Sequence, residues 1–230
     1  YRQDTRHQTR DRDPENRLLS RGPRFRLQGE FIRDNALAIS GLLVNRIGGP
    51  GVRPYQPPGL WAEVGLGGNP KFVQDKGAKL YRRSLYTYWK RSSPPPNMQI
   101  FDAPTREKCL VRRSRTNTPL QALVTLNDVQ FVEAARHLAE RMLRKSTPEE
   151  RIQRGYRLAI ARAPRPSEMR VLLDVLQASE TRFSKDAEAA TALVTTGDSP
   201  HDERLEVAQH AAWTIVASMI LNLDETLTRE

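Results

Sequence analysis

The chain has 230 residues, of which 38% are hydrophobic and 28% are charged, a composition typical of a polar globular protein. It has no run of the ~18 apolar residues that a transmembrane helix needs, and its single cysteine, Cys109, excludes an internal disulfide and a cysteine-rich zinc site. The net charge of +10 is concentrated in residues 71–115, with 12 basic and 3 acidic residues, which indicates an anionic partner without naming it.

The N-terminal part contains two predicted helix starts. DPENRLL at 13–19 is typical of a helix start, because Asp13 can cap the helix and Pro14 suits its first turn. Apolar residues then recur at helical spacing over residues 29–46, and Gly48 and Gly49 follow as a stop signal. We therefore predict a helix over 29–46.

The middle of the chain is predicted to be irregular. Residues 48–77 are dense in glycine and proline, which rules out a regular helix, although a short strand pair around 60–64 and 71–73 is an option. For residues 77–91 the spacing of apolar and aromatic side chains favours a helix, with an extended segment as the alternative. The SSPPPN stretch at 92–97 predicts a rigid polyproline-like connector.

From Pro119 onward the sequence is strongly helical. Thr118 can cap the first helix, and Thr147 with Pro148 repeats the pattern of a capping threonine followed by proline at a later helix start. The predicted helices cover 119–126, 128–144, 146–162, 165–184, 186–197 and 201–228. Short connections favour antiparallel neighbours. We therefore predict a mainly α fold with little β structure: an antiparallel bundle over 119–228, joined by the N-terminal helix and covered by the irregular segment 48–118.

Several long strings resemble one known family. They are DPENRLLSRGPRFRL, GGPGVRPYQPPGLW, LYRRSLYTYWKRSSPPPNMQIFDAP, REKCLVRRSRTNTPLQALVTLND and LNLDETLTRE. In these strings the chain resembles the PSD1 (DUF1553) domain, found mostly in planctomycetes and related bacteria. The resemblance covers nearly the whole chain. It implies a single domain over 1–230 that lacks its extreme N-terminus, with residues 1–118 as the N-terminal helices and basic irregular segment and 119–230 as the bundle.

The resemblance also implies a setting. In that family the domain lies at the C-terminal end of large exported proteins, after a cytochrome-c-like domain and a DUF1549 domain. We therefore expect a periplasmic, cell-surface or extracellular location, with these two domains of the same polypeptide as partners. The chain has no CxxCH haem-attachment motif, so we expect no cofactor in it, and haem only in a neighbouring domain. Its four histidines are scattered and show no metal-ligand spacing.

Two basic stretches are candidate binding sites. In VRRSRTNTP, arginines close to a helix start could bind a sulfate, uronate or haem propionate, or could anchor the loop to buried carboxylates. In YRRSLYTYWKR, aromatic rings could stack on sugars while cations bind acidic groups, or the larger rings could fill the core. The anion-binding candidates are Arg112, Arg113, Arg115, Arg82, Arg83 and Lys90, and the aromatic candidates are Tyr86, Tyr88 and Trp89.

Other reactive side chains favour structural roles. Cys109 would need a base to act as a nucleophile, and although His137 could approach it in space, we interpret Cys109 as a small buried residue. Asp34 and Asp102 are interpreted as arginine partners or helix caps, because neither has a second carboxylate at a spacing that would indicate an acid–base pair. His137 and His210 are interpreted as packed or partly exposed helix residues. No self-contained catalytic motif is visible.

Three functions are compatible with these features. The favoured one is an interaction module or a binding module for sulfated or uronic polysaccharide, working with the DUF1549 and cytochrome-c-like domains. The second is an enzyme site shared with the upstream domain and using the central arginines. Nucleic-acid binding ranks last, because the sequence has no helix-turn-helix, RNA-recognition or zinc-finger signature.

Overall fold

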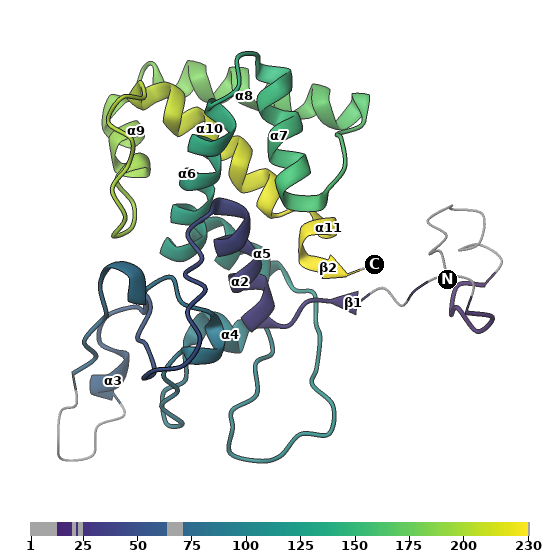
Figure 1. Cartoon of the computed structure of the whole chain (residues 1–230), viewed down its shortest axis with the longest axis vertical. Coiled ribbons are helices and arrows are strands. Elements are labelled where there is room, and N and C mark those ends of the chain that lie inside the picture. Colours follow the sequence, from purple (N-terminus) through teal and green to yellow (C-terminus); the bar gives the residue numbers. More distant parts are fainter. Residues whose placement is uncertain (1–12, 20–21, 23–24, 64–70, 230) are drawn as a thin grey trace.

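The computed structural model describes residues 13–19, 22, 25–63 and 71–229, and the regular structure there is almost entirely helical (Figure 1). Within these ranges the only sheet is one short ladder of two strands. The predicted mainly α fold is therefore confirmed. No helix in the described part of the chain is long and apolar enough to cross a bilayer.

The C-terminal half forms the main core. Its helices are α6 (Val129–Leu143), α7 (Pro148–Ile160), α8 (Pro166–Phe183), α9 (Ala187–Val194) and α10 (Val207–Leu221). The α10 helix contacts the other four and lies obliquely across α6 in Figure 1. It is thus the central element, which agrees with its long apolar sequence.

Small residues let these helices approach closely. The side chains of Ala134, Ala135 and Ala139 on α6 and of Ala211, Ala212 and Ala217 on α10 are fully buried. On α7, a Cβ added at Gly155 would lie 2.8 Å from Cδ1 of Ile220, so only glycine fits there without a shift. Trp213, fully buried on α10, fills much of the remaining volume.

The helix starts follow the capping signals. Thr118 caps α5 (Pro119–Asn127), and Thr147 forms a capping box with Glu150 at the start of α7. The last predicted helix is shorter than expected: it begins at Val207 instead of 201, because the Glu206 side chain accepts hydrogen bonds from the first backbone N–H groups. It ends before Asn222, and α11 (Asp224–Leu227) follows as a separate turn.

The N-terminal helix α2 (Gly29–Ser40) packs against α6. The prediction that it reaches residue 46 is wrong, because Gly41 adopts a left-handed conformation (φ +87°) and its N–H closes the helix on Leu37 and Ala38. Leu42 and Leu43 continue the apolar pattern but pack instead against a separate small cluster.

The two ends of the described chain meet in a ladder. Strand β1 (Phe25–Arg26) pairs antiparallel with β2 (Thr228–Arg229), so that Phe25 lies opposite Arg229. Next to this ladder, the Leu27 N–H donates to the Leu227 carbonyl at 2.9 Å. The side-chain amide of Asn35 on α2 donates to the Thr226 carbonyl at 3.0 Å, which ties α2 to the same end.

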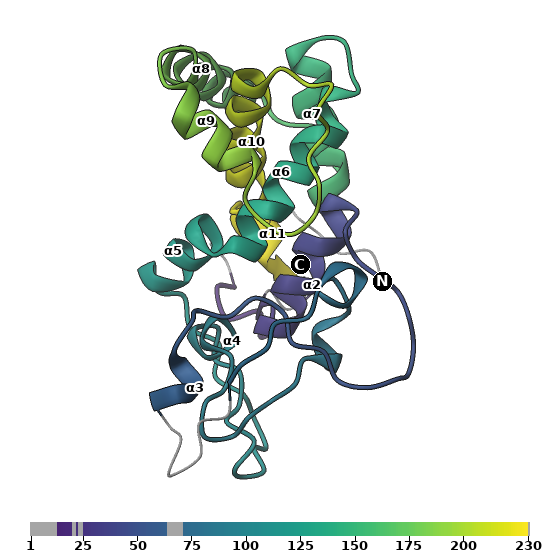
Figure 2. The same cartoon turned by 90° about the vertical axis from the view of Figure 1, so that its left-hand side faces the viewer.

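The segment between α2 and α5 is irregular, as predicted, and lies below the bundle in Figures 1 and 2. Its backbone groups are satisfied by isolated bridges, such as Val52 with Thr87, and by buried side chains. The guanidinium of Arg33, which is 3% exposed, donates to the carbonyls of Leu80 (2.5 Å) and Arg82 (2.8 Å). Asp34 accepts from the Ser84 N–H at 2.7 Å, as expected of a residue that satisfies loop backbone.

Two further helix predictions in this half are wrong. Residues 13–19 form two turns, because the Asp13 carboxylate accepts from the N–H groups of Arg17 and Leu18 without a helix following. The segment 77–91 contains only the short 3₁₀ helices η1 (Gly77–Lys79) and η2 (Ser84–Tyr86), because its carbonyls bind Arg33.

Two other segments that were not predicted to be helical contain short helices. Leu60–Glu63 is the short helix α3, where a strand was an option, and the rest of that strand to residue 64 lies outside the described residues. The proline-rich connector ends in α4 (Pro96–Ile100), whose first residue is the third proline, a position that proline favours.

Candidate functional site

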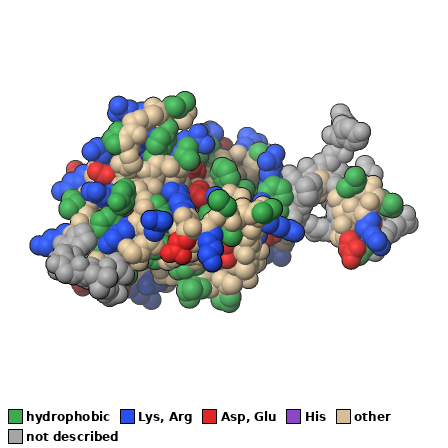
Figure 3. Space-filling model, turned by 90° about the horizontal axis from the view of Figure 1, so that it is seen from below, with side chains coloured by type: hydrophobic (Ala, Val, Ile, Leu, Met, Phe, Trp, Pro, Cys, Tyr) green, Lys and Arg blue, Asp and Glu red, His purple; other side chains and the backbone are tan. Residues whose placement is uncertain are grey.

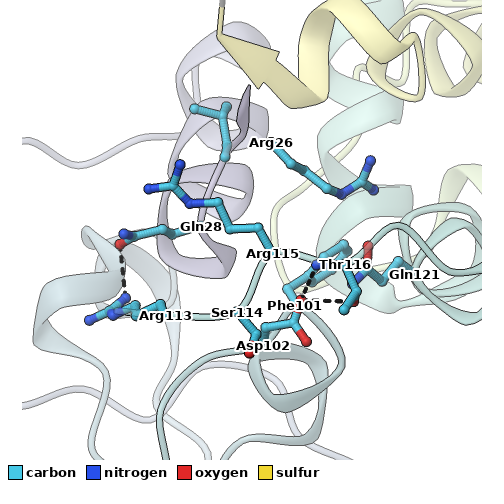
Figure 4. A pocket seen from close by; sticks show the side chains of 10 residues that line it. Arg26, Gln28, Phe101, Asp102, Arg113, Ser114, Arg115, Thr116 and Gln121 are labelled. Carbon is cyan, nitrogen blue, oxygen red and sulfur yellow. Dashed lines mark hydrogen bonds between the residues drawn. The ribbon is translucent and has the colours of Figure 1, made fainter. Parts of the chain in front are cut away.

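A polar cleft lies where the loop before α5 passes the end of β1 and the start of α2 (Figure 4). Its lining is dominated by arginines and hydrogen-bonding groups: Arg26, Leu27, Gln28, Phe101, Asp102, Arg113, Ser114, Arg115, Thr116 and Gln121. A second, more open hollow shares Gln28 and residues 113–115 and adds Leu110, Val111 and Arg112. Residues 113–115 of the loop therefore line both hollows.

One wall of the cleft is fixed by Asp102. This residue adopts a left-handed backbone (φ +59°), which directs its carboxylate toward the loop. There it accepts from the Thr116 N–H at 2.7 Å and from the Thr116 hydroxyl at 2.8 Å. The amide of Gln121 donates to the same hydroxyl at 3.0 Å and to the Ile100 carbonyl at 2.9 Å. The prediction that Asp102 acts as a cap is thus close, although its partner is a loop threonine.

Two buried polar atoms in the cleft lack partners. Gln121 is 1% exposed, yet its Oε1 atom has no hydrogen-bond partner among the described residues, and neither has the buried Nε atom of Arg26. Figure 4 shows the Arg26 side chain on the same side of the cleft as Gln121 and Thr116. Burial lowers the pKa of Arg26, and the charge of Asp102 partly offsets this. The space beside these buried atoms is about 10 Å³, which is room for one water molecule or one hydroxyl group and not for a sugar ring.

The three central arginines have different partners. Arg113 donates to Gln28 at 2.8 Å and forms an ion pair with Glu30 at 3.0 Å, so its charge is neutralised. The guanidinium of Arg115 lies 4.5 Å from the ring centre of Phe25. In the described part of the chain, no carboxylate lies within ion-pair distance of Arg115 or of the exposed Arg112. The anchoring interpretation holds for Arg113, and the other two arginines retain an unpaired charge.

The second basic stretch has mainly internal partners. Arg82 is 6% exposed and donates to the carbonyls of Arg46, Gly48 and Pro50, while its guanidinium stacks 3.9 Å from the ring centre of Tyr86. It therefore organises the irregular segment and is not available to a ligand. Arg83 lies 3.9 Å from Asp34, and the Lys90 ammonium lies 4.7 Å from the ring centre of Trp61.

The aromatic candidates contact three different segments. The hydroxyl of Tyr86 accepts from the Gly48 N–H at 2.8 Å, and Tyr88 packs near Trp61, with ring centres 5.9 Å apart. Trp89 is half-buried and belongs to neither hydrophobic cluster, so the core interpretation is wrong for it. Its ring N–H donates to the Thr105 carbonyl, which lies in the loop before α5.

The family model of PSD1, described as a protein of unknown function (DUF1553), matches residues 1–176. The chain belongs to the PSD1 family. No curated protein and no solved structure matches it. The match contains every residue that lines the cleft of the PSD1 domain and ends within α8, so that α9 and α10 lie beyond it.

Cys109 of the PSD1 domain is exposed, which contradicts the interpretation of this residue as buried. The reason is local: it lies at the outer end of the loop before α5, where no helix or strand covers it. His137 is not free to serve it as a base, because both of its ring nitrogens contact other side chains. Among the described residues, no group of histidine, cysteine and carboxylate side chains could hold a metal ion.

Sequence reasoning missed one buried polar cluster. Ser199 Oγ lies 2.7 Å from His137 Nε2, and His137 Nδ1 lies 3.1 Å from Glu140 Oε2, which is the order of a serine–histidine–carboxylate triad. The serine oxygen, however, also donates to Glu133 at 2.6 Å and accepts from Arg136 at 2.6 Å. Its hydrogen-bonding capacity is therefore filled within the protein.

The same cluster lacks an oxyanion-stabilising donor at Ser199, because the Ser199 N–H donates to Glu133 at 2.9 Å. The Tyr81 hydroxyl donates to this carboxylate as well, at 2.8 Å, and burial, together with this bond, raises the pKa of Tyr81 to about 12. We conclude that the cluster cross-links α6, the loop before α10 and the irregular segment.

A signal for this cluster was present in the sequence. Glu133, Arg136, His137 and Glu140 recur at helical spacing within an alanine- and leucine-rich helix, so they share one face of α6. The partner Ser199, 62 residues away from His137 in the chain, could not have been assigned from spacing. His210 also lies there, and burial lowers its pKa.

Proposed function

We propose that this PSD1 domain binds an acidic carbohydrate, uronic or sulfated, at the arginine-lined surface formed by the cleft and the open hollow. The observation that carries the proposal is the pair of guanidinium groups on Arg112 and Arg115, which have no carboxylate partner among the described residues and line the open hollow of about 700 Å³. The small cleft, which shares Arg115, adds the unpaired donor of Arg26 and the unpaired acceptor of Gln121. Arginine forms forked hydrogen bonds with carboxylates and sulfates. A sugar hydroxyl both donates and accepts, so it matches the Gln121 and Arg26 atoms.

The cleft favours a sugar over a nucleic acid. Duplex DNA is held mainly by repeated phosphate contacts and needs no buried acceptor. Here the Asp102 carboxylate lines the cleft and would repel any anion, whereas the Gln121 acceptor suits a hydroxyl donor. A neutral sugar hydroxyl would therefore face the cleft, and the acidic group of the sugar would face Arg112 and Arg115. An exported protein that encounters wall or matrix polysaccharide is the setting that we propose for it.

The test is binding of the folded domain to an array of uronic and sulfated polysaccharides, with duplex DNA as the comparison. The double variant Arg26→Ala/Arg115→Ala should weaken binding about tenfold or more, because hydrogen bonds to charged groups contribute about 1.5–3 kcal/mol each. Arg170→Ala, an exposed arginine on α8, is the matched control and should bind as the wild type does. Absence of binding by the folded wild type would refute the proposal.

A second candidate function, an interface with the neighbouring DUF1549 or cytochrome-c-like domain, is favoured by α5. Leu120, Leu123 and Leu126 of this helix are 53%, 55% and 44% exposed, at a spacing that places them along one side. Figure 2 shows α5 extending away from the bundle. We propose that this apolar side packs against the preceding domain. Leu120→Gln/Leu123→Gln should abolish co-purification of the two domains and leave carbohydrate binding unchanged.

A further inference from the structure

The loop over residues 103–118 extends from the lower end of the molecule in Figure 1, and both of its roots are fixed. At the first root, the Thr105 carbonyl accepts from the Trp89 ring N–H at 3.1 Å, and the Arg106 guanidinium lies 4.4 Å from the Trp89 ring centre. At the second root, Thr116 is bound by Asp102. The loop therefore presents its outer part in a defined position.

The outer end of this loop is apolar. Cys109, Leu110 and Val111 follow one another and are all exposed, Leu110 at 57% and Val111 completely. Apolar side chains that stay exposed at the end of a loop do not gain the free energy of removal from water. Consecutive exposed apolar residues therefore indicate a partner that covers them. Neither the cleft nor the carbohydrate proposal uses their side chains, so they need a partner of another kind.

Cations surround this apolar tip, which we define as residues 109–111. Lys108 and Arg112 flank it directly, and Arg106 and Arg115 lie further along the two arms. Glu107 is the single carboxylate within residues 106–115. Figure 3, which views the molecule from below, shows lysine and arginine side chains spread over this face. Exposed apolar side chains at the tip are therefore flanked by cationic side chains.

We propose that the tip inserts into the surface of an anionic lipid bilayer. Apolar side chains at such a surface reach the boundary between headgroups and acyl chains, while lysine and arginine remain among the anionic headgroups. The pattern at 106–115 has the two parts in that order: apolar side chains outermost and cations behind them. An acidic polysaccharide would match only the surrounding cations, and an apolar protein groove would match only the tip.

The proposal goes beyond carbohydrate binding and concerns docking on one face of a membrane. It requires no spanning helix, and none is found in the described part of the chain. The fixed roots of the loop would hold the domain with its lower end toward the lipid. The cleft beside Arg115 would then lie close to the membrane surface.

The single cysteine provides a direct test, because Cys109 lies in the tip. An environment-sensitive fluorophore attached there should shift to the blue and brighten with phosphatidylglycerol-rich vesicles, and not with phosphatidylcholine vesicles. The control carries Cys109→Ser and Ser184→Cys, which moves the same label to an exposed position at the end of α8. This control label should show no shift. An unchanged spectrum for the Cys109 label would overturn the proposal.

Co-sedimentation of the unlabelled protein with the same vesicles excludes an effect of the fluorophore. Leu110→Ser/Val111→Ser should lower the partition coefficient about tenfold or more, and Arg112→Ala about fivefold. Both changes lie in an exposed loop, so the fold should be unaffected. Arg26→Ala, in the cleft, should leave vesicle binding unchanged and lower carbohydrate binding only. Binding to anionic vesicles that survives the double apolar change would show that charge alone acts, and would overturn insertion.

Discussion

Arg33 is the side chain on which the irregular half of the domain depends most directly. It is 3% exposed, and its guanidinium donates to the carbonyls of Leu80 and Arg82, to the Ser84 hydroxyl and to the side-chain oxygen of Gln130. Burial lowers its pKa to about 10, and the neighbouring Asp34 is the main group that opposes this shift. Arg33 therefore remains charged at neutral pH and keeps all of its donors.

The change Arg33→Met keeps an unbranched side chain, shorter than that of arginine, and removes every donor. Four buried acceptors, on Leu80, Arg82, Ser84 and Gln130, would then lose a partner, at a cost of about 1–3 kcal/mol for each one left unpaired. Removal of a buried charge offsets part of this cost. We expect the free energy of unfolding to fall by about 3 kcal/mol, within the range for breaking a buried charged network.

Two measurements check this prediction. Urea denaturation gives the loss of stability, and hydrogen exchange shows where it acts: the amides of residues 80–88 should lose protection before those of α6 and α10. Arg170→Met, on the exposed side of α8, is the control and should change stability little. A loss below about 1 kcal/mol with unchanged exchange over 80–88 would show that the segment is held by other contacts.

Two further predictions concern the bundle. Gly197→Ala should destabilise the protein by about 2 kcal/mol or more, because φ is +100° and the new Cβ would lie 2.3 Å from Cδ of Glu133. The control is Gly48→Ala, with φ +78° and no atom within 4 Å of the new Cβ, which should cost only about 1 kcal/mol. Equal losses of stability in thermal denaturation would contradict the close-contact argument. Arg162 lowers the pKa of Glu168 to about 2, so the stability from this pair is complete above about pH 4.5 and is lost as pH falls toward 2. The stability difference between the wild type and Arg162→Met should therefore shrink over that range in denaturant titrations, and a constant difference would mean that packing, not charge, is responsible.

The bundle could be predicted from the sequence because its signals are local. Thr118 and Thr147 mark helix starts by accepting hydrogen bonds from residues three positions away, and Pro148 does so through its fixed φ angle. The apolar spacing on α6 and α10 needs no knowledge of the partner helix. The end of α2 was missed because the apolar pattern continues past Gly41 into a different cluster. Periodicity shows which residues are buried, but not in which cluster.

The irregular half was predictable only in kind. Glycine and proline exclude long helices there, but the conformation of 77–91 is set by Arg33 and by Asp34, roughly 50 positions earlier in the chain. The cleft was found in part: Arg115 was a candidate, whereas Arg26 and Gln121 give no local signal in sequence, because their importance comes from an unpaired atom in a folded cleft. The exposure of Cys109 likewise depends on how far the loop projects.

The short ladder between Phe25 and Arg229 determines how the domain responds to force. Chain segments joined at residues 25 and 229 would pull on the same end of an antiparallel pair, so the load would open its bonds one after another, as in a zipper. Such a geometry yields at low force, while the core of α6 and α10 lies outside the path of tension as long as the ladder is closed. Within a larger polypeptide under tension, the ladder would therefore open first, and only then would the load reach the helices.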